Sequence, residues 1–184
     1  MSKLETNTID TVSGTTNLTI GSTNSSTVTF ENGSPTGHMY PAFEAKRTSD
    51  QSVTDATTTK VQFPTKVFDT DNYYDNTTNY RFTPLVAGKY YVYASIQSDA
   101  SGSSDLRRTR LMIHKNGSQY RQAQWLQDTY RARQQNPYMA AVIEMNGTTD
   151  YLEVFVYIDD DSGNPVVNGS SANQNYFGAY RIGA

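Results

Sequence analysis

The chain contains no cysteine among its 184 residues. Disulfides, cysteine-ligated zinc sites and thiol chemistry are therefore excluded. Histidine is nearly absent as well, with only His38 and His114. No nucleophile-elbow, phosphate-loop or dinucleotide-binding pattern is found. These absences predict a protein that is not an enzyme and that carries no cofactor.

Long apolar runs are also missing, since no stretch approaches the ~20 apolar residues of a membrane-spanning helix. The opening segment MSKLETNTID has no apolar h-region, so we expect no secretory signal and synthesis in a cytoplasm. The net charge is only −3 and the sequence pI is 5.3, which gives no broad positive field. We therefore expect neither nucleic acid nor a membrane as a partner.

The residues that are abundant favour β-structure. Hydrophobic residues make up 36% of the chain, a low share for a globular domain, yet tyrosine alone contributes 14 residues. Tyr, Thr, Val and Phe favour strands, whereas Asn, Gly and Ser favour turns. The composition predicts an all-β protein with a thin core and a polar surface rich in tyrosine.

Residues 1–38 form a distinct segment rich in Thr, Ser and Asn. Two short pieces alternate apolar and polar residues, around Leu18 and Ile20 and around Val28 and Phe30. Neither piece could bury enough surface alone to offset the entropy lost on ordering. The segment is therefore either a disordered leader or an extended β-arm that orders against neighbouring chains. We favour the arm, anchored by these four apolar side chains.

Residues 39–184 are predicted to form one antiparallel domain after the Gly/Pro-containing boundary at residues 33–37. Asn-Gly pairs, which favour two-residue hairpin turns, recur between the strand patterns. Residues 119–135 lack a helical apolar stripe and are predicted as strand and loop. The spacing predicts a jelly-roll sandwich. The predicted strands cover Pro41–Ala45, Lys60–Phe63, Tyr80–Phe82, Lys89–Ile96, Arg108–His114, Tyr138–Glu144, Tyr151–Ile158 and Tyr176–Ile182.

Four short motifs occur in a fixed order: YRFTP at 80–84, GKYYVY at 88–93, LMIHKNG at 111–117 and YFGAY at 176–180. They resemble motifs of the globular head of complement component 1q and its tumour necrosis factor-like relatives. The resemblance covers roughly residues 42–182 and implies a homotrimer with aromatic residues along its three-fold axis. One departure is GTTDYLEV at 147–154, where the family has a shorter Gly-Asp turn. No collagen-like repeat precedes the domain.

The strand Lys89–Ile96 carries tyrosine on both faces. Tyr90 and Val92 share one face, whereas Tyr91 and Tyr93 share the other. Such a strand can pack inward on one side and against a neighbouring subunit on the other. A plain sandwich core without a trimer is the alternative. The aromatic residues expected in the core or the trimer interface are Tyr91, Tyr93, Tyr151, Phe155, Tyr157 and Tyr180.

Two charged groups are weaker candidates. Asp159, Asp160 and Asp161 crowd carboxylates into a turn and could bind calcium, although the spacing does not fit an EF-hand loop and an ordinary solvated turn is the simpler interpretation. The densest basic set could dock on an acidic partner or glycan, or could form ion pairs that contribute little. Its docking candidates are Arg108, Arg110, Arg131 and Arg133.

The Thr/Asn-rich arm is similar in style to virion proteins of tailed phages. These observations give the hypothesis of a homotrimeric head decoration (cement) protein, made in the host cytoplasm and located on the virion. Its expected partners are itself and a major capsid or tail protein, reached through the N-terminal arm. The alternative is a tail-fibre tip or baseplate adhesin that binds a host-surface glycan or receptor.

Overall fold

A computed structural model describes residues 41–101, 105–161, 163–169 and 173–183. These residues form antiparallel strands and no helix, which confirms the all-β prediction. No helix in this part of the chain is long and apolar enough to span a membrane. The four proposed anchor residues Leu18, Ile20, Val28 and Phe30 lie outside the described residues, as does the predicted boundary at residue 38.

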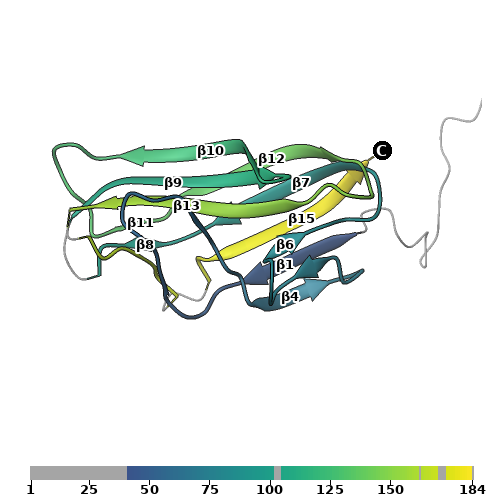
Figure 1. Cartoon of the computed structure of the whole chain (residues 1–184), viewed down its shortest axis with the longest axis horizontal. Coiled ribbons are helices and arrows are strands. Elements are labelled where there is room, and N and C mark those ends of the chain that lie inside the picture. Colours follow the sequence, from purple (N-terminus) through teal and green to yellow (C-terminus); the bar gives the residue numbers. More distant parts are fainter. Residues whose placement is uncertain (1–40, 102–104, 162, 170–172, 184) are drawn as a thin grey trace, which may run out of the picture. The chain divides into compact units, whose positions relative to one another are not determined.

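The first layer is a five-stranded sheet, which carries the site discussed below (Figure 1). Its strands are all antiparallel to their neighbours and include the strand with tyrosine on both faces. In spatial order they are β12 (Tyr138–Met145), β7 (Gly88–Ser95), β15 (Tyr176–Gly183), β1 (Ala42–Lys46) and β4 (Thr65–Asp69).

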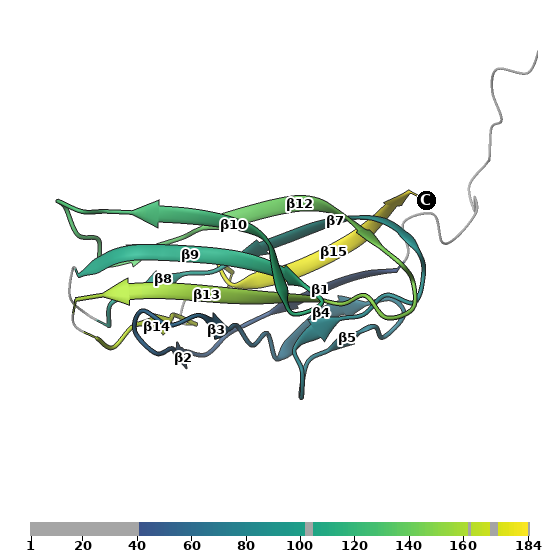
Figure 2. The same ribbon diagram turned by 45° about the horizontal axis from the view of Figure 1, so that its top comes forward.

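The second layer is a six-stranded sheet. Its long strands β10, β9 and β13 lie side by side and pair antiparallel (Figures 1 and 2). The order is β10 (Ser118–Leu126), β9 (Leu106–Lys115), β13 (Leu152–Asp160), β6 (Arg81–Phe82) and β5 (Tyr74–Asp75), and β3 (Thr59–Lys60) pairs with β13.

A small four-stranded sheet extends the first layer. β8 (Ser98–Asp99) follows β7 and pairs with β11 (Gln134–Gln135), which precedes β12. The Ile96 amide donates to the Pro137 carbonyl at 3.3 Å, which links the two ladders. The other two strands are β14 (Val166–Val167) and β2 (Gln51–Ser52), and Figure 2 shows both near β3.

The hairpin between β9 and β10 has the predicted Asn-Gly turn. Asn116 and Gly117 have φ values of 54° and 78°, the left-handed conformation that this dipeptide tolerates. The turn sets the register in which β10 pairs along β9 up to the pair Leu126 and Arg108. The prediction of strand and loop for residues 119–135 is therefore correct.

The core between the layers is aromatic and is built from the motif residues. The Phe43 ring lies 4.3 Å from Phe82, 4.8 Å from Tyr74 and 4.9 Å from Phe177, measured between centroids. All four side chains are almost fully buried. The motifs at residues 80–84 and 176–180 thus supply core rings from both sheets, and their order along the chain reflects how the sandwich closes.

Two local predictions need correction. The predicted strand Lys60–Phe63 is reduced to the short β3, although Val61 and Phe63 are fully buried. Strand β4 was not predicted. Its register with β1 shifts, because Phe68 pairs with Glu44 and Lys66 pairs with Ala45. This bulge at Val67 breaks the simple alternation by which a strand is recognised in a sequence.

Candidate functional site

The outer face of the five-stranded sheet carries a cluster of five tyrosines, here called the tyrosine face: Tyr91, Tyr93, Tyr138, Tyr176 and Tyr180. They come from the adjacent strands β12, β7 and β15. The Tyr91 ring centroid lies 5.4 Å from that of Tyr180, and Tyr93 lies 6.1 Å from both Tyr91 and Tyr176. The Tyr91 and Tyr138 hydroxyl oxygens are 3.2 Å apart. The rings therefore form one connected surface.

A glycine on β15 makes room for the centre of the cluster. Gly178 pairs with Tyr93 across the strands, and a Cβ at Gly178 would lie only 2.4 Å from the Tyr93 Cζ. The Tyr93 ring therefore lies over the bare backbone of Gly178. Its hydroxyl donates to Glu44 Oε2 at 2.8 Å. Both contacts are made at the hydroxyl end of the Tyr93 ring.

Two of these phenols have raised pKa values. Burial, helped by the hydrogen bond to Glu44 and its charge, raises the pKa of Tyr93. The hydrogen bond with Tyr91, followed by burial, raises the pKa of Tyr138 to about 12. Neutral hydroxyls can donate as well as accept hydrogen bonds, so the face can meet a partner without burying a phenolate.

Exposed apolar side chains extend the tyrosine face across the sheet. Val142 is 50% exposed and Tyr138 is 47% exposed on β12, while Ile182 is 47% exposed on β15. On β4, Val67 and Phe68 are 50% and 45% exposed. Exposed apolar side chains gathered on one face are typical of a surface that a partner covers, and tyrosine suits such interfaces because its ring is apolar and its hydroxyl is polar.

The six aromatic residues predicted from the sequence do not form one group. Tyr91, Tyr93 and Tyr180 belong to the tyrosine face, whereas Tyr151, Phe155 and Tyr157 lie on or next to β13 in the other sheet. Cations of the same domain cover the second three. Arg81 lies 4.6 Å from the Tyr151 centroid, Lys60 lies 5.7 Å from Phe155, and Arg110 lies 4.9 Å from Tyr157. His114, whose pKa is lowered by burial, also stacks on Phe155 at 4.1 Å.

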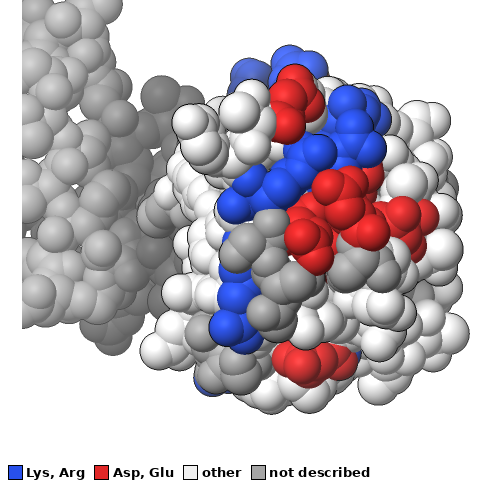
Figure 3. Space-filling model, turned by 90° about the vertical axis from the view of Figure 1, so that its left-hand side faces the viewer, with Lys and Arg blue, Asp and Glu red and all other residues white. Residues whose placement is uncertain are grey.

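The four arginines predicted to dock on a partner do not form one group either. Arg108 and Arg110 lie two residues apart on β9, and Arg110 Nε donates to Gln124 Oε1 at 2.8 Å. Arg131 pairs with Asp161 at 3.1 Å, and Arg133 approaches the buried Asp99 at 3.7 Å. Figure 3 shows the end of the domain where β13 ends, with basic side chains in a band beside acidic ones. At this end the arginines are engaged by carboxylates of their own chain.

The three candidate calcium ligands do not converge. Asp159 and Asp161 both approach Arg107, at 3.9 Å and 3.6 Å, whereas Asp160 is almost fully buried. Within the described part of the chain, no three His, Cys, Asp or Glu side chains form a group that could hold a metal ion.

Comparison with known proteins identifies the fold. No protein-family model and no curated protein matches the chain. Among solved structures, the globular domain of zebrafish complement 1qA is 17% identical with a TM-score of 0.53, over 77% of this chain and 96% of that one. Murine APRIL at pH 5.0 is 10% identical with a TM-score of 0.55, over 79% and 99%. Eiger TNF from S. frugiperda is 11% identical with a TM-score of 0.54, over 76% and 90%.

The domain is a jelly roll of the complement 1q and tumour necrosis factor type. The likeness expected from the four motifs is thereby confirmed at the level of the fold. The identities of 10–17% carry the fold alone. Any assembly or partner of this jelly roll must therefore be argued from its own surface.

Sequence reasoning missed several residues of this surface. Tyr138 and Val142 alternate with buried Met139 and Ile143 on β12, so strand periodicity could have identified them. Tyr176 is similarly set beside Phe177. Phe68 gave no such signal, because it lies on the bulged strand β4.

Proposed function

We propose that the chain is a non-enzymatic virion structural protein that forms homotrimers through the tyrosine face. The observation that carries this proposal is the contrast between the two outer sheet surfaces. Rings on the five-stranded sheet are uncovered and bordered by Val142 and Ile182, whereas those on the six-stranded sheet are covered by cations. A second copy of the chain can bury the uncovered rings, and the tyrosine hydroxyls can still find hydrogen-bond partners at such an interface.

The role we assign on the virion is that of a head decoration, or cement, protein. Such a protein stabilises a particle by binding the assembled lattice and not its free subunits, which shifts the equilibrium toward the intact capsid. The Thr/Ser/Asn-rich segment of residues 1–38 supports an anchor that adds strands to a capsid surface. The jelly roll then projects from the particle.

Light scattering of the purified chain at micromolar concentration tests the self-association. We expect about three times the 20.5 kDa of one chain. Val142→Asp, at a position 50% exposed on the tyrosine face, should reduce the mass to that of a monomer. The matched control is Leu126→Asp, at a position 46% exposed on β10, which should leave the trimer intact. A monomeric wild-type protein, or equal effects of both substitutions, would refute the assignment.

Quantitative mass spectrometry of purified virions tests the role on the particle. A decoration protein should be present in a number comparable with that of the capsid subunits. A few copies per particle would instead identify a tail-fibre tip or baseplate protein, and absence from virions would reject both roles.

A further inference from the structure

A polar cleft of about 510 Å³ opens at an edge of the sandwich, where β4 ends one sheet and β5 ends the other. This volume lies within the range of about 300–1,000 Å³ that is usual for small-ligand sites. The cleft is separate from the tyrosine face, which lies on β12, β7 and β15. Its lining residues include Lys66, Asn72, Tyr73, Arg81, Thr83 and Leu85.

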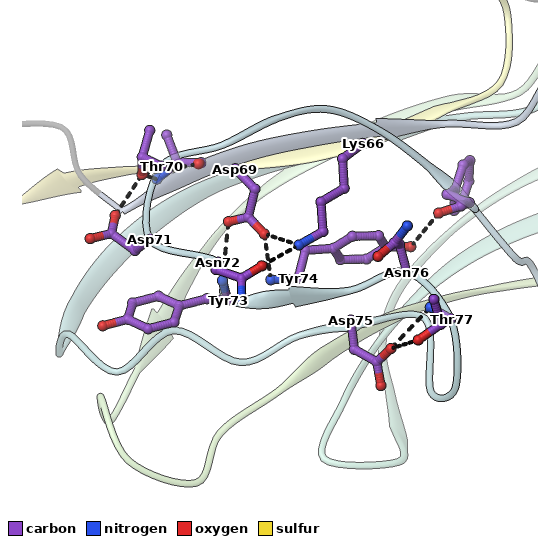
Figure 4. Close-up of polar contacts among 12 residues, drawn as sticks. Lys66, Asp69, Thr70, Asp71, Asn72, Tyr73, Tyr74, Asp75, Asn76 and Thr77 are labelled. Atoms are coloured by element: carbon purple, nitrogen blue, oxygen red, sulfur yellow. Dashed lines mark hydrogen bonds and ion pairs between the residues drawn. The ribbon is translucent and has the colours of Figure 1, made fainter.

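One wall of the cleft is held by Asp69. Its carboxylate accepts the backbone N–H groups of Tyr73 and Tyr74, each at 3.1 Å. Lys66 Nζ donates to Asp69 Oδ2 at 2.8 Å and to Asn72 Oδ1 at 2.6 Å, and Figure 4 shows these side chains converging. The Lys66 charge is therefore already neutralised. Lys66 therefore holds Asp69 and Asn72 in place and contributes little to the binding of an anionic ligand.

Asp75 also lines the cleft, and its carboxylate accepts the N–H groups of Thr77, Thr78 and Asn79. Figure 4 shows the contact with Thr77. These bonds, with that of Thr78 first, hold the pKa of Asp75 well below its usual range. The carboxylates of Asp69 and Asp75 both hold backbone groups of their own chain. A wall that is ordered before binding also reduces the entropy lost when a ligand enters.

The hydrogen-bonding groups of the cleft that have no partner indicate the chemistry of a ligand that could bind there. Arg81 stacks over Tyr151 with 4.6 Å between Cζ and the ring centroid. No described residue gives its guanidinium a carboxylate partner or accepts a hydrogen bond from it. The Asn72 amide nitrogen and the Thr83 hydroxyl likewise have no partner within the described ranges. Leu85, 54% exposed, adds an apolar wall.

We propose that this cleft binds a carboxylated oligosaccharide, with the sugar carboxylate on Arg81 and sugar hydroxyls on Asn72 and Thr83. An arginine fork binds a carboxylate through two parallel hydrogen bonds. Neutral amide and hydroxyl groups match the hydroxyls of a sugar ring. A nucleic acid or an acidic protein surface would need a row of unpaired cations, whereas Arg81 is the one unpaired cation that lines this cleft in the described structure.

The test is a printed array of neutral and carboxylated oligosaccharides probed with the full chain, followed by calorimetry on the glycans that bind. We expect binding to carboxylated sugars that weakens about tenfold or more in Arg81→Ala. Arg121→Ala is the matched control, because Arg121 lies over Tyr120 at 4.8 Å but outside the cleft. It should bind as the wild type does.

Thr83→Val provides a second variant that keeps the side-chain shape and removes one hydroxyl, so it reports on the cleft even if Arg81→Ala is poorly folded. It should weaken binding severalfold and leave the oligomeric mass unchanged, which separates this test from that of the trimer. Three results would overturn the proposal: no carboxylated glycan retained, equal losses in Arg81→Ala and Arg121→Ala, or displacement of the glycan by equimolar acetate or sulfate.

Discussion

Gly178 determines the position of the central ring of the tyrosine face. The φ values of the strand are ordinary at this residue, so its role is spatial and not conformational. The Tyr93 ring occupies the space where a side chain would stand. This arrangement lets an aromatic ring cover the backbone of a glycine in the neighbouring strand, which compensates for the weak strand propensity of glycine.

Gly178→Ala should lower the free energy of unfolding by about 1–3 kcal/mol, because the new methyl group overlaps the Tyr93 ring. Urea denaturation monitored by circular dichroism measures the loss. Gly183→Ala on the same strand is the control, since a Cβ there meets no atom within 4 Å. Similar losses at both positions would show that strand propensity, and not the contact with Tyr93, explains the effect.

Strand alternation correctly divided Tyr90 and Val92 from Tyr91 and Tyr93, because side chains on a strand point to opposite faces in turn. Alternation could not show that Tyr151 and Tyr157 face the other side of the molecule. Arg81 and Arg110 cover these two rings from different strands, β6 and β9. These contacts between rings and cations depend on which strands are neighbours in the sheet. The local sequence does not determine that.

The hairpins β9–β10 and β12–β13 are joined through Asp150. Its Oδ1 accepts a hydrogen bond from Asn116 Nδ2 at 2.7 Å, and its Oδ2 accepts one from the backbone N–H of Asn146 at 2.9 Å. Lys115 Nζ lies 2.9 Å from the same carboxylate. Burial raises the pKa of Asp150, but the hydrogen bonds from Asn116 and Lys115 outweigh burial, so the pKa is lowered overall. One carboxylate therefore fixes two turns.

Asp150→Ala should reduce the free energy of unfolding by about 2 kcal/mol at pH 7, since charge-assisted hydrogen bonds are lost at a mostly buried site. The lowered pKa means that the contribution is complete above about pH 4 and is lost as the pH falls through the folded-state value. Urea titrations at pH 7 and pH 3 should show the difference from the wild type shrinking at acid pH. The control is Asp128→Ala at an exposed position, which should have little effect at either pH. A loss of stability in Asp150→Ala that is the same at pH 7 and pH 3 would contradict this explanation.

Strands with regular alternation of apolar and polar residues were predicted closely. β9, β12, β13 and β15 each begin and end within two residues of the predicted ranges. β4 was not predicted, because its bulge at Val67 removes the alternation. The cleft next to β4 escaped the sequence analysis for the same reason.

The whole chain combines a jelly roll with a segment of different composition. The hydrophobic core of the jelly roll is formed by strands from β1 onward, with Phe43 and Phe177 from opposite ends of the domain in contact. A domain of about 145 residues with such a core is large enough to fold independently. We therefore expect residues 39–184 to be sufficient for folding and trimer formation.

Deletion of residues 1–38 tests this expectation and the anchoring role together. The truncated protein should keep its cooperative thermal transition and its trimeric mass, but it should no longer bind particles that lack the wild-type protein. Co-sedimentation with such particles measures the loss. If the deletion unfolds the domain or dissociates the trimer, residues 1–38 belong to the core and the anchor hypothesis is wrong.

The sequence by itself determined the fold class, because alternating strands, Asn-Gly turns and the motif rings Phe82, Tyr90 and Phe177 are local signals of a jelly roll. The tertiary structure alone decided which tyrosines gather on one face, which aromatic residues are covered by cations, and that Lys66, Asn72 and Arg81 line one cleft. The physical reason is that antiparallel pairing joins strands far apart in the chain. Whether a side chain is buried, and whether a charged side chain lies next to it, therefore depend on that pairing.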